Sequence, residues 1–373
     1  MFKSTGLLLL LGMVLAMGSS RTMAQKAKAP TAAERNAAID KGIAFLAKAQ
    51  GADGSYSTKS GTGVTSLIVH SLLRNGRSVT DPTVAKGLKY LEANVREDGG
   101  IYAKDSFLRN YETCLAVVCL AEANKDGKYT KIIKNADGYL KGIQLDEQEN
   151  KNKSDLDYGG VNYGTRGNPD LSNTSYLVEA LVAAGNGPED EALKKALVFI
   201  SRCQNLESEH NTTALAAKVN DGGFYYSVAE SEAKEGAKGG KGQTPEGGLR
   251  SYGSMSYAGM KSMLYAGLTP EDQRVKAALK WLSMHYTVEQ NPGLGDKGLY
   301  YYYQLMAKAL NAAKMKTFKD DKGVEHDWKA EMSQVLLSKQ KADGSWVNTD
   351  AKWMESDPNL ATGFAILALS YCQ

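Results

Sequence analysis

Carboxylates inside apolar sequence are the residues of this chain best placed to exchange a proton. Glu112 directly follows Tyr111 at the start of an apolar segment, where dry surroundings would make its carboxyl group a candidate acid. The same position suits a first-turn carboxylate stabilised by the positive end of a helix, and both interpretations stay open. Glu179 lies within the apolar run Leu177 to Leu181, so once buried it needs a proton or a cationic partner. Lys261, in another apolar segment, is a candidate for that partner.

Aromatic and polar residues recur where the apolar segments begin. If these segments are helices that meet in a ring, their first residues converge on a central funnel, where Asp170 is a third weak candidate for a catalytic acid. Aromatic walls suit an apolar or carbocation-like ligand, or the face of a sugar. The alternative is that each tyrosine packs between helices, and a run of four tyrosines can turn only one or two side chains toward the funnel. The candidate lining residues are Tyr111, Asn173, Tyr252, Tyr257, Tyr300, Tyr301 and Tyr302.

A repeated unit organises the chain around these residues. Two segments, Lys41 to Tyr56 and Glu331 to Trp346, place a glutamine, a glycine and an aromatic residue at the same offsets after a short amphipathic stretch. Four weaker copies lie between them, so the chain is predicted to contain six units. The matching residues of the two strong copies are Gln50, Gly54 and Tyr56, and Gln340, Gly344 and Trp346.

The units predict alternating outer and inner helices. Ala32 to Lys48 and Glu191 to Ile200 carry Lys and Glu at helical spacing with one apolar stripe, which is typical of an outer helix. The segments between them are apolar nearly all round, as helices buried on both sides must be. We predict an all-α protein, an (α/α)6 toroid of six helical hairpins with concentric inner and outer helices. The inner segments are Val64–Leu73, Tyr111–Ala121, Thr174–Ala184, Tyr257–Ala266, Tyr300–Leu310 and Thr362–Tyr371.

The repeat resembles the QW repeat of squalene-hopene and oxidosqualene cyclases. It also looks like the repeats of protein prenyltransferase β subunits, which share the α/α toroid, and it suggests a prenyltransferase and squalene oxidase repeat protein. The resemblance covers most of the mature chain, from Ala33 to Gln373. In that family the glutamine and the aromatic residue join neighbouring helices at the rim, so the resemblance implies a structural role for Gln50, Gln340 and Trp346.

The catalytic motifs of these relatives are not matched. Class II cyclases start their reaction with an aspartic acid of a DxDD motif at the mouth of an inner helix. The nearest match here is DLSNT at residues 170–174, in which Ser172 and Asn173 replace the second and third aspartates. The proton donor that the family uses is therefore missing.

Zinc ligation by Asp, Cys and His, as in protein prenyltransferases, is not matched either. None of the four histidines pairs with a Cys or Asp at the spacing of that family, so we predict neither a metal nor another cofactor. Complement-type thioester domains, a third relative with this toroid, need Cys-Gly-Glu-Gln, which is also missing. The histidines are His70, His210, His285 and His326.

The first 24 residues have the pattern of a cleavable export signal. Lys3 precedes an apolar run, Gly6 to Gly18, of only about a dozen residues, whereas spanning a bilayer takes roughly 20. Small residues then precede Gln25 and suit a cleavage site. We therefore predict an exported protein, periplasmic or extracellular, without a stable membrane span, whose residues 25–373 form one toroid domain.

Composition narrows the partners of the mature chain. Acidic and basic residues are interspersed and nearly balance, which argues against nucleic acid as a partner. Residues 146–157 and 229–248 interrupt the repeat with charged, amide-rich or glycine-rich sequence, and we expect both to form mobile loops at one rim. The cysteines have no disulfide spacing and are predicted to be small core residues: Cys114, Cys119, Cys203 and Cys372.

Together these features favour an exported toroid that binds a ligand or acts as a scaffold. Its aromatic funnel would accept a hydrophobic small molecule or a glycan. An alternative is a terpene cyclase-like isomerase or transferase acting on a polyisoprenoid. A second alternative is a carbohydrate-active α/α barrel, which needs paired carboxylates facing a sugar cleft. The oligomeric state stays open.

Overall fold

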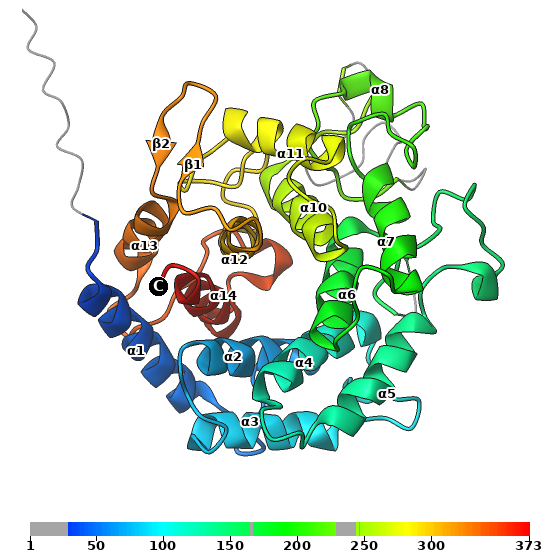
Figure 1. Ribbon diagram of the computed structural model, residues 1–373. Coiled ribbons are helices and arrows are strands. Elements are labelled where there is room, and N and C mark those ends of the chain that lie inside the picture. Colours follow the sequence, from blue (N-terminus) through cyan, green and yellow to red (C-terminus); the bar gives the residue numbers. More distant parts are fainter. Residues whose placement is uncertain (1–28, 165–166, 229–243, 246) are drawn as a thin grey trace, which may run out of the picture.

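Two concentric rings of helices form the computed structural model, which describes residues 29–164, 167–228, 244–245 and 247–373 (Figure 1). The outer ring consists of α1 (Ala32–Ala49), α3 (Pro82–Ala93), α5 (Thr130–Lys141), α7 (Glu191–Arg202), α11 (Gln273–Met284) and α13 (Trp328–Lys339). The inner ring consists of α2 (Gly63–Arg74), α4 (Arg109–Ala123), α6 (Leu171–Ala183), α10 (Gly253–Tyr265), α12 (Leu299–Ala312) and α14 (Pro358–Ser370). Each outer helix precedes an inner one, so the described helices include six hairpins, and the predicted α/α toroid is confirmed.

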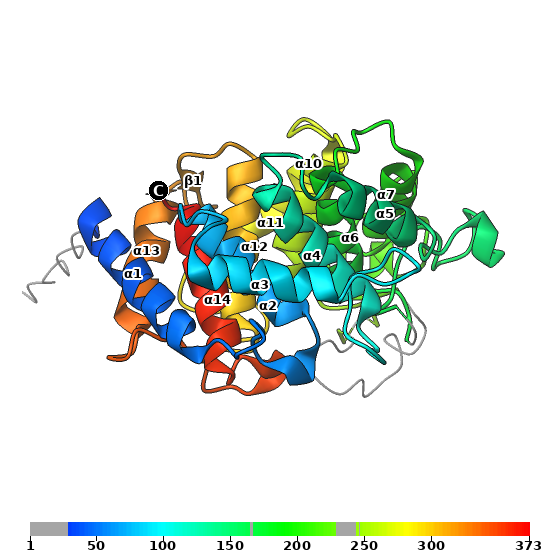
Figure 2. The same ribbon diagram turned by 90° about the horizontal axis from the view of Figure 1, so that it is seen from below.

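The inner helices close into a barrel. Each packs on the next around the ring, α2 on α4, α4 on α6, α6 on α10, α10 on α12 and α12 on α14, and α14 returns to α2. The outer helices sheathe this barrel, as the view turned by 90° also shows (Figure 2). Because every inner helix is reached through the same turn, all six begin at one rim, which we call the mouth, and end at the opposite rim, the far end.

Acidic caps fix where the outer helices begin. The Asp81 carboxylate accepts hydrogen bonds from the backbone N–H groups of Thr83 and Val84 at the start of α3. Asp190 and Asp272 cap α7 and α11 in the same way, and Pro82 occupies the first turn of α3. Carboxylates at these positions satisfy free N–H groups and oppose the positive helix end.

The inner helices supply the core. From Val64 to Leu72 every residue of α2 is buried, and α14 is buried from Leu360 to Ser370. This all-round burial explains why the inner segments lack a polar face. The four cysteines are free and buried, as predicted.

The repeat glutamines join neighbouring hairpins. Gln50 Nε2 donates to the carbonyl oxygens of Gly54 at 3.0 Å and of Thr83, in the next outer helix α3, at 2.9 Å. Gln340 makes the same pair of bonds, to Gly344 and, where the ring closes, to Ala38 of α1 at 2.8 Å. The glutamines of two weaker repeats bond in the same way to α7 and α11, and these are Gln144 and Gln204.

The repeat glycine lets the turn approach the next outer helix closely. Gly54 has a φ of 91°, and a Cβ there would lie 2.2 Å from the carbonyl oxygen of Lys86 in α3. A Cβ at Gly344 (φ 89°) would likewise lie 2.4 Å from the carbonyl oxygen of Lys41 in α1. Only glycine combines this left-handed conformation with such an approach, so the residue is required by the packing of adjacent repeats.

Shorter elements lie in the connections. These are η1 (Thr58–Ser60), η2 (Glu147–Glu149), η3 (Lys352–Met354), α8 (Ala216–Val219) and an antiparallel pair of strands, β1 (Phe318–Lys319) with β2 (Glu325–His326). Residues 146–157, expected to be a mobile loop, contain η2 and are bonded to α7 through Lys195 and Arg202. The predicted export signal and most of the 229–248 loop lie outside the described residues.

Candidate functional site

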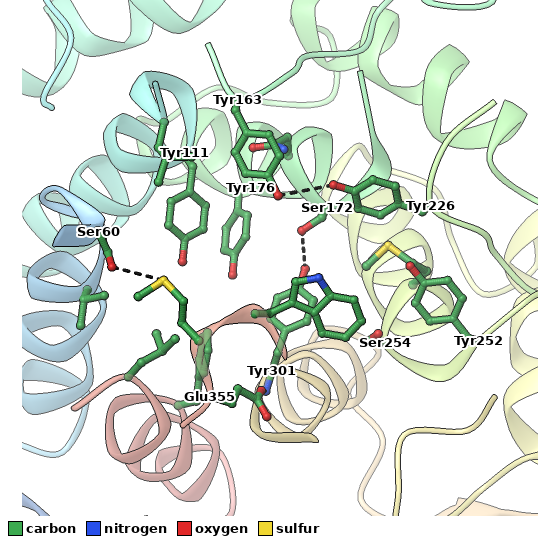
Figure 3. Close-up of a pocket in the computed structure, with 18 residues that line it drawn as sticks. Ser60, Tyr111, Tyr163, Ser172, Tyr176, Tyr226, Tyr252, Ser254, Tyr301 and Glu355 are labelled. Carbon is green, nitrogen blue, oxygen red and sulfur yellow. Dashed lines mark hydrogen bonds between the residues drawn. The ribbon is translucent and has the colours of Figure 1, made fainter. Parts of the chain in front are cut away.

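A cavity of about 310 Å³ opens at the mouth of the barrel (Figure 3). Side chains at or beside the starts of all six inner helices line it, because the turns bring these helix starts to one rim. The volume is at the lower end of the range for small-molecule sites in proteins. The lining residues are Ser60, Val64, Leu108, Tyr111, Tyr163, Ser172, Asn173, Tyr176, Tyr226, Tyr252, Ser254, Met255, Tyr301, Trp353, Met354, Glu355, Leu360 and Phe364.

Aromatic rings form much of the cavity wall. Tyr111 of α4 meets Tyr176 of α6 edge-on, with ring centroids 5.1 Å apart. Tyr301 of α12 lies 6.3 Å from Tyr176 and 5.9 Å from Phe364 of α14. Figure 3 shows the hydroxyl groups of Tyr111 and Tyr176 pointing into the same space. The rings therefore connect four inner helices around one apolar volume.

The phenols of this wall stay protonated at ordinary pH. Burial raises the pKa of the hydroxyl groups of Tyr111, Tyr176 and Tyr301 well above the ordinary value for tyrosine. Tyr301 Oη and Ser172 Oγ are hydrogen-bonded at 2.8 Å, and the hydroxyls of Tyr163 and Tyr226 are 3.4 Å apart. Each pair joins groups far apart in the sequence and places neutral O–H groups on the cavity wall.

Glu355 is the single carboxylate in the lining of the described residues. Its side chain is fully buried and accepts hydrogen bonds from the backbone N–H groups of Tyr300 (3.2 Å) and Tyr301 (2.7 Å), at the start of α12. Asn348 Nδ2 donates to it as well, at 2.7 Å. Burial raises the pKa of Glu355, and these hydrogen bonds oppose the rise. The carboxylate thus caps α12 as well as facing the cavity.

The predicted lining residues divide into two groups. The structure places Tyr111, Asn173, Tyr252 and Tyr301 in the wall of the cavity. The other three are buried elsewhere: Tyr302 donates to the carbonyl oxygen of Thr287 at 2.6 Å, Tyr257 packs against Tyr302, and Tyr300 packs edge-on against Tyr303. As expected of a run of tyrosines on one helix, only Tyr301 turns inward.

Two of the candidate acids act as structural carboxylates. Glu112 accepts hydrogen bonds from the backbone N–H of Thr62 (2.7 Å) and that of Ala103 (2.8 Å), and also from Ser106 Oγ. It thereby connects the starts of α2 and α4 and does not line the cavity. Asp170 caps α6 by accepting from the backbone N–H of Asn173 at 2.9 Å.

Glu179, the third candidate, lies toward the far end of the barrel. Lys261 of α10 donates to its carboxylate at 2.6 Å, and Lys308 of α12 donates to the other oxygen. Burial pushes the pKa of Glu179 up, but the two ammonium groups outweigh it and hold the pKa below its ordinary value. Glu179 and His70 line a different hollow, at the far end. Lys261 is therefore the partner that the sequence suggested.

Several cavity residues were not anticipated from the sequence. Trp353, Met354 and Glu355 come from the connection before α14, while Tyr163 and Tyr226 come from turns that precede α6 and α10. Position was the one available signal for Tyr163, Trp353, Met354 and Glu355, which lie shortly before an inner helix, and it was missing for Tyr226, which lies far ahead of α10. Tyr176 belongs to the predicted inner segment, one turn before Glu179.

The described residues also bear on metal binding and on membrane insertion. Among the described residues, no three His, Cys, Asp or Glu side chains cluster so as to hold a metal ion. No described helix is long and apolar enough to cross a bilayer.

Comparison with known proteins agrees with the fold. The family model of the squalene-hopene cyclase C-terminal domain matches residues 57–228. Comparison with curated protein sequences gives no match.

Solved structures match nearly the whole ring. The type II terpene cyclase MstE from Scytonema, in complex with geranylgeranyl dihydroxybenzoate as substrate, shares 11% identity at a TM-score of 0.55, covering 91% of this chain and 97% of that chain. A protein from Salmonella enterica serovar Paratyphi A, described as a possible member of the GH105 family, shares 12% identity at a TM-score of 0.53, covering 96% and 98%. At such identities the likeness is one of fold. The chain therefore has the terpenoid cyclase-like α/α toroid fold, and residues 57–228 are similar to the squalene-hopene cyclase C-terminal domain.

Proposed function

We propose that the cavity at the mouth binds a neutral hydrophobic small molecule and holds it without chemical conversion. The observation that carries this proposal is the lining itself: aromatic and aliphatic side chains, neutral hydroxyl groups and one carboxylate that is already bonded as a helix cap. Enclosed apolar walls with a few oriented polar groups are typical of small-molecule sites.

The charge of the lining favours a ligand without an anionic group. The lining of the described cavity contains no Lys, Arg or His, whereas sites for phosphate or carboxylate groups usually supply such cations. Glu355 would in addition repel an anion at short range. A prenyl diphosphate is therefore disfavoured, and a neutral isoprenoid alcohol or a similar molecule fits better.

The hydroxyl pairs can recognise one polar group on such a ligand. In a hydrogen-bonded pair of hydroxyls, one O–H is used within the pair and the other is left to donate elsewhere. Ser172 with Tyr301 is such a pair in the wall of the cavity. A ligand hydroxyl or carbonyl oxygen could accept from this pair while the apolar body packs between the rings of Tyr111 and Tyr176.

The absence of conversion is proposed from the environment of Glu355. A catalytic acid must direct an O–H toward the substrate. Glu355 accepts from Tyr300, Tyr301 and Asn348, and all three donors stabilise the ionised carboxylate. In the segment that corresponds to the cyclase acid motif, Asp170 is engaged as the cap of α6.

Ligand extraction tests the binding proposal directly. Purified protein is extracted with organic solvent, the extract is analysed by mass spectrometry, and binding of geranylgeraniol is measured by calorimetry. Ser172→Phe would fill the cavity and should weaken geranylgeraniol binding at least tenfold. Ser154→Phe makes the same change at an exposed position and should bind as wild type. Equal affinity of the two variants would show that the cavity is not the site.

Cyclase chemistry on a polyisoprenoid is the second candidate, because the buried Glu355 has a raised pKa. It is tested by incubating the protein with squalene and with geranylgeraniol and looking for cyclised products by gas chromatography. Product formed by wild type and lost in Glu355→Gln would replace the binding proposal with an enzymatic one. A glycosidase would need a second carboxylate facing the cavity, and the described lining offers Glu355 alone.

We further propose that binding takes place outside the cytoplasm. The proposal rests on the short apolar run and the small residues before Gln25. N-terminal sequencing of the protein recovered from cells tests it, with Gln25 as the expected first residue. A retained Met1 would contradict cleavage.

A further inference from the structure

One wall of the cavity is built differently from the others. Inner helices supply most of the lining, but Trp353 and Met354 belong to residues 348–355, a connecting segment between α13 and α14 that we call the strap. Both side chains are large and apolar, yet Trp353 is 43% exposed and Met354 42% exposed. The strap thus lays two partly exposed apolar side chains against a pocket that is lined mainly by inner helices.

The base of the strap is firmly held. The backbone N–H of Asn348 donates to the carbonyl oxygen of Glu355 at 2.9 Å, which closes the segment into a loop. Asn348 Nδ2 bonds both the Glu355 carboxylate (2.7 Å) and the carbonyl oxygen of Asp296 (2.6 Å). Glu355 in turn is bonded to the start of α12. The two ends of the strap therefore cannot move independently of the barrel.

The tip of the strap is held weakly. Among the described residues, the bond from Ser60 Oγ to Met354 Sδ at 3.3 Å is the hydrogen bond that joins residues 349–354 to another hairpin, and sulfur is a weak acceptor. Trp353 and Met354 are also the one adjacent pair of non-glycine residues with positive φ in the described chain, at 51° and 65°. This left-handed backbone is unfavourable for L residues, so the closed position is held against local strain.

The indole of Trp353 rests on a glycine. Gly298, just before α12, has no side chain, and a Cβ built there would lie 2.7 Å and 2.9 Å from two carbons of the indole ring. Gly298 therefore permits the ring to lie in its present position. Gly295 has the same φ of 63° but nothing within 4 Å of a built Cβ. Substitutions at the two glycines therefore distinguish the effect of contact with the indole ring from the effect of backbone conformation.

We propose that the strap is the gate of the cavity: Trp353 and Met354 swing about the fixed base at Asn348 and Glu355 to admit the ligand, and close over it. The proposal rests on the proposed function for its ligand, a neutral hydrophobic molecule. The firm base, the weakly bonded and strained tip and the exposed apolar side chains are the features that a hinged cover requires. The inner helices serve as the rigid part of the pocket.

Tryptophan fluorescence can follow the gate in the intact protein. The other three tryptophans, Trp281, Trp328 and Trp346, are at most 3% exposed, so quenching by acrylamide reports mainly on Trp353. Gly298→Ala should displace the indole and increase quenching about twofold over wild type. Gly295→Ala, which introduces the same side chain at the same φ, should leave quenching unchanged. Trp353→Phe supplies the background from the buried tryptophans.

Geranylgeraniol then tests whether the motion serves the cavity. Saturating geranylgeraniol should protect Trp353 from acrylamide in wild type, and Gly298→Ala should change its association rate at least threefold relative to Gly295→Ala. Equal quenching of the two glycine variants would overturn the gate whatever binds. Increased quenching in Gly298→Ala together with an unchanged association rate would also overturn it, because the moving strap would not control entry. If geranylgeraniol fails to bind any variant, the ligand proposal falls, while the quenching comparison still decides whether the strap is hinged.

Discussion

The two ends of the inner barrel differ in their buried polar groups, which are mainly charged at the far end and mainly neutral at the mouth. Toward the far end, Glu179 is paired with both Lys261 and Lys308, so each of these charged groups has an opposite charge beside it within the protein. At the mouth, the lining consists of neutral hydroxyl groups and rings, with Glu355 used as a helix cap. The same six helices thus carry a buried layer of charged groups that pair with one another and, at the opposite end, a neutral cavity whose hydroxyl groups can still donate hydrogen bonds. This difference agrees with a structural role for the charged layer and with the proposal that the mouth binds the ligand.

The helix dipoles are consistent with this division. Six inner helices end at the far end, where their free carbonyl groups concentrate partial negative charge, and buried cations are stabilised there. The excess of one lysine over the single glutamate fits this environment. At the mouth the helix starts are positive, and the carboxylates of Glu112, Asp170 and Glu355 cap them.

The largest expected effect comes from breaking the charged layer. Glu179→Gln would leave Lys261 and Lys308 buried without their counter-charge, and should lower the free energy of unfolding by about 3–5 kcal/mol. Urea unfolding at neutral pH measures this. The control is Glu122→Gln in the adjacent hollow, where no ion pair with a lysine or arginine is found among the described residues. If the two variants lose the same stability, the layer is not the structural element inferred here.

The next largest effect is a loss of stability at acidic pH, caused by a buried histidine at the far end. His70 is buried beside the charged layer, and burial lowers its pKa to about 3 from an ordinary value of 6.5. Between these values the unfolded chain binds a proton that the folded chain does not, so stability falls as the pH drops from 6.5 toward 3. The slope from this group is at most about 1.4 kcal/mol per pH unit.

Replacing His70 isolates this contribution. In His70→Leu the loss of stability between pH 6.5 and 4 should be shallower than in wild type, because the leucine binds no proton in either state. Urea unfolding at a series of pH values in this window gives both slopes. Parallel slopes would mean that His70 is protonated in the folded protein.

At the mouth, the hydrogen bonds of the repeat glutamines should contribute less to stability than the charged layer does at the far end. Gln50→Ala removes two hydrogen bonds and leaves the carbonyl oxygens of Gly54 and Thr83 without the amide, so unfolding should become easier by about 1–3 kcal/mol. The control is Gln148→Ala at an exposed position of η2, which should change stability by less than about 0.5 kcal/mol. Thermal unfolding distinguishes the two. An unchanged melting temperature in Gln50→Ala would contradict its role in joining repeats.

Removing a hydroxyl group from the cavity wall should have the smallest effect on stability. Tyr301→Phe removes the hydroxyl that pairs with Ser172 and should cost about 0.5–1.5 kcal/mol, while weakening geranylgeraniol binding severalfold. Tyr257→Phe makes the same change at a buried tyrosine outside the cavity and should leave binding unchanged. Calorimetric binding curves for the two variants check this. Similar losses of affinity in both would mean that tyrosine hydroxyls act through the fold and not through contact with the ligand.

The sequence was sufficient for the ring because its pattern is periodic. Glutamine, glycine and aromatic residues at fixed offsets specify the turn, and all-round apolar segments specify the inner helices. The pattern also pointed to Lys261 as a partner for Glu179, since an unpaired charge in an apolar helix needs an opposite one.

The cavity was only partly predictable. Tyr301 could not be told from Tyr300 or Tyr302, because four successive tyrosines give a helix no polar asymmetry from which to derive its rotation. Glu355 stands in a short polar sequence that is typical of an exposed turn, and it is buried only because the connection folds back over the start of α12. Side chains from irregular connections depend on tertiary contacts that have no period.

The bond from Gln340 to Ala38 of α1 has a consequence for synthesis. It joins the last repeat to the first across roughly 300 positions of the chain, so the surface of α1 that packs on α13 and α14 stays uncovered until the final hairpin has been made. Until then α1 and the growing edge of the ring expose apolar side chains, a state in which proteins of this size aggregate. We therefore expect both edges of the ring to stay uncovered during most of translation, and truncation of the last hairpin would leave both of them exposed.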